Sequence, residues 1–175
     1  MKKNQLTTTK STAVILGKTK SLMNITKKIL EGNNKGLVTT KVSQDITIIG
    51  DLLWEKKTQE KMSWNDAMEY AKNLRLGGYD DWRLPTTDEL LEVVTRCGGV
   101  DTTYGDDYWS EIAGKNRANK IYQANYRTKG FGFIIYWSSD SIYSDTAGLV
   151  DFYNGYQSHL YKHTNLYVRC VRAGQ

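Results

Sequence analysis

Apolar residues recur at helical spacing in three stretches of the chain. The first stretch consists of Leu22, Ile25, Ile29 and Leu30, with lysines off the apolar stripe and Gly32 after its end. This pattern predicts a short amphipathic helix near the N-terminus. Such a helix suits packing on the domain or self-association with its copy in another subunit, and a basic one also suits contact with a membrane surface or a partner's groove.

The second and third stretches have clearer start signals. Ser63 stands three residues before Asp66, and Thr86 forms a capping box with Glu89. The apolar positions that follow at helical spacing are Ala67, Tyr70, Ala71 and Leu74 in the second stretch and Leu90, Leu91, Val93 and Val94 in the third. Two helices are therefore expected on either side of Gly77–Pro85.

Runs of β-branched and aromatic residues predict strands. The runs are Val38–Val42, Ile46–Trp54 interrupted at Gly50, Phe131–Trp137, Gly148–Tyr153, Tyr156–Tyr161 and Leu166–Val171. Asn154-Gly155 predicts a hairpin turn within the resulting C-terminal meander. Gly99–Lys129 has no clear period, so a long loop is expected there, with short strands near Trp109 and over Ile121–Tyr126.

The chain has a high aromatic content, with twelve Tyr and five Trp beside one Pro. Aromatic side chains favour cores and contact surfaces. Those large side chains that fall on alternating strand positions are predicted to be core: Trp82, Leu84, Trp137, Val150, Phe152, Val168 and Cys170. Arg83, between two of them, is expected to hold an Asp or backbone carbonyls.

Charge divides the chain into two parts. Residues 1–42 contain nine Lys and one acidic residue, Glu31, and therefore carry +8; since the whole chain carries +5, residues 43–175 carry −3. We expect a basic N-terminal arm over 1–42 and one folded domain over 43–175. A domain of this charge is not expected to bind nucleic acid. No apolar run is long enough for a membrane span or a signal-peptide core, which makes the cytoplasm the expected location.

Six sequence blocks occur in an order that resembles a known family. The blocks are Leu52-Leu53-Trp54, Met62-Ser63-Trp64, residues 76–86 (Leu-Gly-Gly-Tyr-Asp-Asp-Trp-Arg-Leu-Pro-Thr), Tyr136-Trp137-Ser138-Ser139, residues 150–155 (Val-Asp-Phe-Tyr-Asn-Gly) and residues 167–172 (Tyr-Val-Arg-Cys-Val-Arg). Together they resemble the C-terminal domain of the Legionella collagen-like protein, a family of the C-type lectin-like superfamily. The blocks at 76–86 and 167–172 are the most specific.

This resemblance implies an α+β, C-type lectin-like fold. Two helices would pack on a short, mostly antiparallel twisted sheet, preceded here by the N-terminal amphipathic helix, with the chain ends brought together and long loops on one face. Relatives of the fold include adhesins that bind sulfated polysaccharides, the variable proteins of diversity-generating retroelements and formylglycine-generating enzymes. Because these functions differ, the fold alone does not identify the function.

No residue set completes a catalytic or metal site. His159 and His163 fall in an expected strand and turn without the Glu of a zinc-protease motif. The loop acids Asp101, Asp106, Asp107 and Glu111 depart from calcium-loop spacing. The close-spaced redox cysteines of formylglycine-generating enzymes have no counterpart, so such a catalyst is a distant alternative. We expect no enzyme activity, no cofactor and no metal.

The two cysteines leave two alternatives open. Cys97 and Cys170 lie far apart in the sequence, and neither has a second Cys or a His at metal-ligand spacing. They are buried free thiols if the protein stays in a reducing compartment, and a disulfide if it is exported.

Residues 138–165 have the composition of a binding surface. Tyr, Ser, Asn, Asp, Gly and His recur there as in antibody combining loops, because Tyr supplies contact area at a low cost in conformational entropy. The expected ligand-binding residues are Tyr143, Asp145, Tyr153, Asn154, Tyr156 and His159, and the expected ligand is a protein or a polysaccharide. By resemblance to retroelement variable proteins, this stretch would be the diversified one.

A different class of function is also open. The chain could serve as a structural or assembly subunit that self-associates through Leu22, Ile25, Ile29 and Leu30, with the C-terminal domain as a passive cap. Comparing the mass in solution of the full chain with that of residues 43–175 separates this function from ligand binding.

Limited proteolysis of the full chain should cut between Glu31 and Lys41 and leave a folded C-terminal fragment. The reason is the Gly/Asn-rich break over Gly32–Gly36, after which the net charge changes sign. Mass spectrometry locates the cut, and circular dichroism tests whether the fragment stays folded. A fragment that unfolds once the arm is lost would place the N-terminal helix in the core instead.

Overall fold

The computed structural model describes residues 45–58, 60–102 and 110–174. In chain order the elements are β1 (Ile46–Ile49), β2 (Leu52–Glu55), α3 (Trp64–Asn73), α4 (Thr87–Arg96), α5 (Glu111–Ala118), α6 (Lys120–Thr128), β3 (Ile135–Ser141), β4 (Thr146–Asp151), β5 (Tyr156–Tyr161) and β6 (Val171–Ala173). The predicted arm, its helix at Leu22–Leu30 and the strand Val38–Val42 lie outside the described residues. Within the described part, no helix has the length and apolar character needed to cross a membrane.

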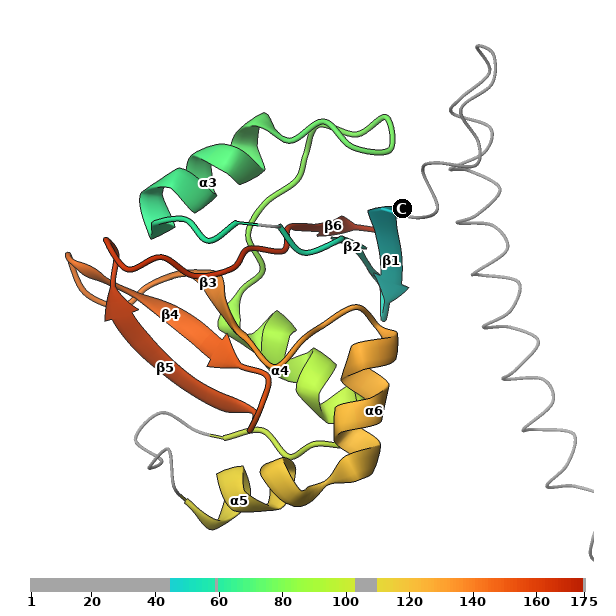
Figure 1. The fold of residues 1–175 in the computed structure, drawn as a ribbon. Helices are drawn as coiled ribbons and strands as arrows, with labels where there is room; N and C mark the ends of the chain where they lie inside the picture. Colours follow the sequence, from blue (N-terminus) through green and yellow to red (C-terminus); the bar gives the residue numbers. More distant parts are fainter. Residues whose placement is uncertain (1–44, 59, 103–109, 175) are drawn as a thin grey trace, which may run out of the picture.

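The strands form two antiparallel sheets of three strands each (Figure 1). One sheet has the order β1-β2-β6 and therefore pairs the first strands of the domain with the last one. The other has the order β3-β4-β5, with β4 in the centre. The expected α+β fold class is confirmed, including the meeting of the two ends of the domain in one sheet. The structure adds two helices to the expected pair and divides the expected single sheet into two.

The two predicted helices begin where their capping residues indicate. Ser63 Oγ accepts a hydrogen bond from the Asp66 backbone at the start of α3. At the start of α4, Thr86 Oγ1 accepts from the Glu89 backbone at 3.2 Å, and the Glu89 carboxylate accepts from the Thr86 backbone at 2.8 Å. Glu89 also pairs with Arg83, whose Nη1 donates to the Leu84 carbonyl. Arg83 therefore holds a carbonyl as expected, but its acidic partner is Glu89 and not an Asp.

The expectation of a long loop with short strands over residues 99–129 holds for residues 99–102, which have neither helix nor strand, but is wrong over residues 111–128. Residues 111–118 form α5, and residues 120–128 form α6. Ile and Tyr favour strands intrinsically, but Tyr122 and Tyr126 stand one helical turn apart and are both fully buried in the core. Asn119 starts α6 by accepting from the Tyr122 backbone at 3.0 Å. The predicted strand near Trp109 lies outside the described residues.

Two strand predictions at the C-terminal end are displaced. β3 begins at Ile135 and not at Phe131, because the backbone turns at Gly132, whose carbonyl accepts from Ile134 at 2.9 Å. The run Leu166–Val171 is buried along most of its length, but it makes only single bridges, with Met62 and Tyr136, before β6 begins. In contrast, β5 and the turn at Gly155, where φ is 68°, are found as predicted.

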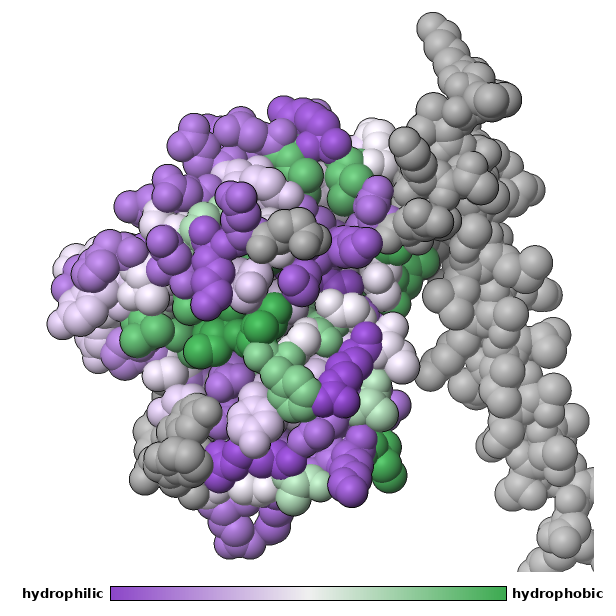
Figure 2. Space-filling view, in the orientation of Figure 1, coloured by the Kyte–Doolittle hydropathy of each residue, from purple (hydrophilic) through white to green (hydrophobic). Residues whose placement is uncertain are grey.

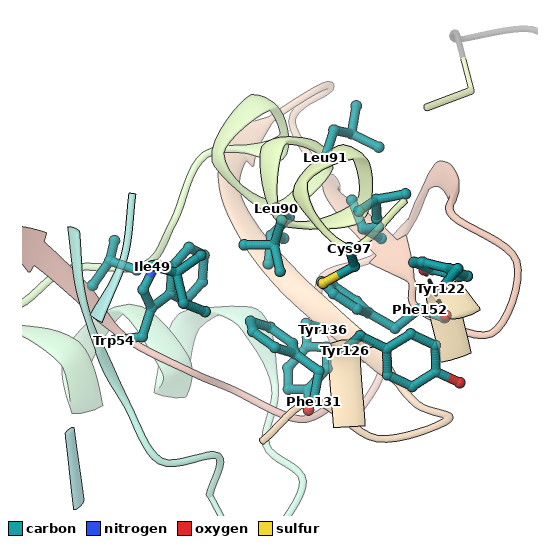
Figure 3. Packing of buried hydrophobic residues seen from close by; sticks show 14 residues of the cluster. Ile49, Trp54, Leu90, Leu91, Cys97, Tyr122, Tyr126, Phe131, Tyr136 and Phe152 are labelled. Carbon is teal, nitrogen blue, oxygen red and sulfur yellow. Dashed lines mark hydrogen bonds between the residues drawn. The ribbon is translucent and has the colours of Figure 1, made fainter. Parts of the chain in front are cut away.

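The core consists of two clusters. The first packs α4 and α6 against β3 and β4, and its aromatic rings are shown in Figure 3; Phe131 stacks on Phe152 at 4.2 Å between ring centroids. The second packs α3 against Trp82, Trp137 and Leu149. All seven predicted core residues are buried: Trp82, Leu84, Trp137, Val150, Phe152, Val168 and Cys170. Cys97 and Cys170 are both buried free thiols, which selects that alternative over a disulfide.

Replacing Trp82 or Trp137 by Ala should destabilise the domain by about 3–5 kcal/mol, because each change leaves a large cavity. Each also removes an indole N–H that donates at 3.1 Å, from Trp82 to the Leu76 carbonyl and from Trp137 to the Met62 carbonyl. Urea unfolding measures the loss, with Trp137→Phe as a milder control. A midpoint that stays at the wild-type value in both Ala variants would contradict this description of the core.

Candidate functional site

The β4-β5 hairpin carries most of the predicted ligand-binding residues. Its ladder runs without interruption from the pair Thr146 and Tyr161 to the pair Asp151 and Tyr156. Every residue of β4 is buried, whereas β5 is only partly covered. On the face shown in Figure 2, apolar side chains gather over the β3-β4-β5 sheet and hydrophilic side chains surround them. The hairpin thus pairs the buried central strand β4 with the more exposed edge strand β5.

The predicted residues lie toward both ends of this hairpin. Tyr143 and Asp145 stand in the turn before β4, and Tyr153 stands in the turn after it. At about 3.3 Å per residue, the six residues of β4 separate the two turns by about 17 Å. His159 pairs with Gly148 between them, and Tyr156 pairs with Asp151 near the second turn. The structure therefore places these side chains along one hairpin and not in one compact site.

The first end contains a group of exposed aromatic side chains. Tyr143 is 64% exposed, and its ring meets that of His159 edge-on at 5.6 Å between centroids. Tyr161 is 56% exposed and stacks on His163 at 5.5 Å. Sequence reasoning did not select Tyr161 or His163 as ligand contacts. The signal for Tyr161 was its spacing from His159, since alternate residues of a strand share a face. His163 lies in the turn after β5, where strand alternation gives no signal.

Lys162 holds the turn at this first end. Its Nζ donates to Ser141 Oγ at 2.8 Å and to the Ser144 carbonyl at 3.0 Å, and its backbone N–H donates to the Asp145 carbonyl at 2.8 Å. The ammonium group also lies 4.6 Å from the centroid of the Trp64 ring. Tyr143 and Asp145 are thereby presented from a turn whose backbone is braced on both sides.

Tyr153 is part of a second exposed group. Its ring is 39% exposed and lies 5.4 Å from the ring of Phe133, which is itself 46% exposed. The Tyr153 backbone N–H donates to Asp151 Oδ1 at 2.8 Å. Arg127 of α6 stands over the other partner, with its guanidinium carbon 4.1 Å from the Phe133 ring centroid. This end therefore combines two aromatic rings with a cation.

Asn154 is a correction to the predicted contact surface, because its side chain is fully buried. Its Oδ1 accepts from the Tyr156 backbone at 3.0 Å, and its carbonyl accepts from Asn116 Nδ2 at 2.9 Å. The side chain therefore shapes the turn and cannot reach a ligand outside the domain. The Asn154-Gly155 pair correctly predicted the turn, but the prediction that Asn154 lies on the contact surface was wrong.

The ionisable groups of the described residues include two cysteine thiols and several acidic side chains. Burial raises the pKa of the Cys97 thiol and that of the Cys170 thiol, which keeps both protonated and unreactive at neutral pH. Within the three described ranges, no group of three or more His, Cys, Asp or Glu side chains could hold a metal ion. Glu111 pairs with Lys115 at 2.8 Å, and the loop acids Asp106 and Asp107 lie outside the described residues.

A cleft of about 530 Å³ lies elsewhere, between α3 and residues 80–84. Its floor is apolar, and charged side chains stand at its rim; the lining residues are Met68, Glu69, Ala71, Lys72, Asn73, Asp80, Trp82, Arg83 and Leu84. None of the predicted ligand-binding residues lines this cleft.

Comparison with known proteins yields one family. The family model described as the Lcl C-terminal domain matches residues 48–172, which is more than half of the chain. No curated protein matches the sequence. Among solved structures, the crystal structure of botrocetin aligns with a TM-score of 0.40 and 10% identity, over 74% of this chain and 96% of that one.

Asn154→Ala should lower the free energy of unfolding by about 1–3 kcal/mol, because it leaves the Tyr156 N–H without its acceptor inside the domain. Asp145→Ala should change it by no more than about 0.5 kcal/mol, since that side chain is exposed. Chemical denaturation of the two variants side by side measures the difference. Equal stabilities would mean that Asn154 is not needed for the turn.

Proposed function

This chain belongs to the Lcl C-terminal domain family, and on that premise we propose that it is a non-catalytic ligand-binding module. The contacts come from the β4-β5 hairpin and the turns at its two ends. The contact residues are Tyr143, Asp145, Tyr153, Tyr156 and His159, to which we add Tyr161 and from which we remove the buried Asn154.

The observation that carries this proposal is the exposure of large aromatic side chains on a braced backbone. More than half of the surface of Tyr143 and of Tyr161 is accessible, although every residue of the neighbouring strand β4 is buried. Exposed Tyr side chains on a rigid support provide large contact areas with little loss of conformational entropy on binding.

The spacing of the contacts favours a large ligand. A separation of about 17 Å between the two turns exceeds the reach of a compact small molecule, whereas standard protein interfaces bury about 800 Å² on each partner and span such distances. A protein or a polysaccharide fits both ends at once. We propose that this ligand is held without a cofactor, because tyrosines, a carboxylate and an imidazole supply the polar contacts.

We further propose that the exposed positions of this surface tolerate diversification by a retroelement. Substitution at Tyr143, Asp145 and Tyr153 changes side chains at the surface, whereas substitution at Asn154 changes a buried turn. Sequencing the flanking genome tests the idea directly. A reverse transcriptase gene with a template repeat matching the codons of residues 143–161 supports it, and a flank without them refutes it.

Tyr153→Ala and Tyr156→Ala should each weaken binding by about 1–2 kcal/mol, because tyrosines are frequent anchors in such surfaces. The ligand is first selected with the full chain on a glycan array and by peptide display, and affinities are then measured by calorimetry. Met68→Ala is the matched control, since Met68 and Tyr153 are both 39% exposed but Met68 lies on α3.

The thermal midpoint of both Tyr variants should stay close to that of the wild type, and chelation of divalent ions should leave the affinity unchanged. Unchanged affinity together with a large loss of stability would show that the two tyrosines are structural. A requirement for calcium would refute the proposal that the ligand is held without a cofactor.

A further inference from the structure

The outer face of α6 combines cations with an unusually exposed aliphatic side chain. Tyr122 and Tyr126 turn inward and are fully buried, which directs Lys120, Ala124 and Arg127 outward at a spacing of four and then three residues. Ile121 stands beside them with 71% of its surface exposed. In Figure 2, strongly hydrophilic and apolar side chains adjoin one another where α6 runs.

Charge on the domain is distributed unevenly, and α5 and α6 form its positive part. Residues 111–129 contain five cations, Lys115, Arg117, Lys120, Arg127 and Lys129, against the single acid Glu111, a net charge of +4. Residues 45–102 contain seven basic and twelve acidic residues, a net charge of −5. Residues 130–174 contain three basic and three acidic residues and are neutral. A positive face on a domain with a net negative charge attracts an anionic partner and orients it toward that face.

The Arg127 side chain is held in place by two aromatic rings. Its guanidinium carbon lies 4.1 Å from the Phe133 ring centroid and 5.9 Å from that of Tyr126. Stacking on an aromatic ring restricts the side chain, and because Arg127 is exposed its guanidinium can still donate to a carboxylate. Because Phe133 is 46% exposed, the cation and the ring form one continuous surface.

We propose that the α6 face, defined by Lys120, Ile121, Ala124, Arg127 and Phe133, binds an acidic protein segment that carries hydrophobic side chains. The carboxylates pair with Lys120 and Arg127, and separate hydrophobic side chains of the segment pack on Ile121 and on Phe133. Ala124 lies between the two cations and is small enough to let a partner backbone approach the helix. Phe133 also contacts Tyr153 of the proposed ligand surface, so the two sites adjoin near the C-terminal end of α6. The test variants lie in the first turn of α6 and leave the hairpin residues unchanged.

Two features favour a protein over other occupants. An aliphatic side chain such as Ile121 cannot stack on a nucleobase. Its burial is most favourable when an apolar side chain of the partner covers it. The chain's own arm, residues 1–42 with a net charge of +8, is repelled by a face of the same sign. An acidic segment with leucines at helical spacing satisfies both the charge and the apolar requirement.

The test measures binding of the full chain to a fluorescein-labelled acidic peptide with leucines at helical spacing, by fluorescence anisotropy. Lys120→Glu and Ile121→Asp should each weaken binding about tenfold, through charge repulsion and loss of the apolar contact. Both changes place an acid in the first turn of α6, where acids stabilise a helix, so unfolding does not account for the loss. Lys72→Glu on α3 makes the same change of charge at another exposed position and should leave binding unchanged.

Peptides in which Ser replaces Leu, or Lys replaces Glu, should not bind. The proposal is overturned if the Ser peptide binds as well as the Leu peptide, or if Lys72→Glu weakens binding as much as Lys120→Glu. It is also overturned if only single-stranded DNA or a sulfated polysaccharide binds in a manner sensitive to Lys120→Glu. The proposal is likewise overturned if the peptide does not bind and the mass of the protein in solution rises with concentration in the wild type but not in Ile121→Asp. That result would assign the face to a second copy of this chain.

Discussion

Residues 169–172 run through the middle of the domain and bond to segments on both sides. Val171 exchanges two backbone hydrogen bonds with Arg83, at 3.0 and 2.8 Å. Cys170 accepts from the Glu55 backbone at 2.8 Å, and its own N–H donates to the Glu55 carboxylate at 2.9 Å. Because all four residues are buried, each polar group must find a partner inside the domain, and these partners lie in segments far away in the sequence. This requirement holds β2, residues 83–84 and the terminal segment together in space.

The side chains of Arg169 and Arg172 in this segment also bond to distant parts of the chain. Arg169 donates from Nε to the Glu55 carbonyl and from Nη1 to the Lys129 carbonyl at the end of α6, and its guanidinium carbon lies 4.1 Å from the Phe131 ring centroid. Burial lowers the pKa of Arg169 to about 10, so the side chain stays charged at neutral pH. Arg172 pairs with Asp81 at 2.6 Å, which lowers the pKa of that carboxyl group. Removal of the Asp81 carboxylate would leave the buried Arg172 guanidinium without its acidic partner, which is destabilising.

Glu55 shows how this centre differs from the surface where binding is proposed. Burial raises the pKa of its carboxyl group, while the Tyr70 hydroxyl and the Cys170 N–H donate to its two oxygens. Its polar atoms are thus occupied in joining α3, β2 and the terminal segment. The exposed hairpin tyrosines and the α6 face have the opposite character, because their side chains are accessible. A rigid centre of this kind lets exposed side chains be exchanged without loss of the fold.

The sequence by itself determined the elements whose signals are local. The capping hydrogen bonds of α3 and α4 join residues three positions apart, such as Thr86 and Glu89. The hydrogen bond of the Asn154-Gly155 turn joins residues two positions apart, so the sequence predicts both features. Only the tertiary structure decided that Tyr122 and Tyr126 form a helix, since their burial against α4 outweighs the strand preference of their side chains. It alone decided that Asn154 points inward to a turn braced by Asn116, and that the hairpin separates the predicted contacts into two groups. These outcomes depend on partners tens of residues away in the sequence, and Glu55 and Cys170 are 115 positions apart. No local pattern specifies such distant contacts.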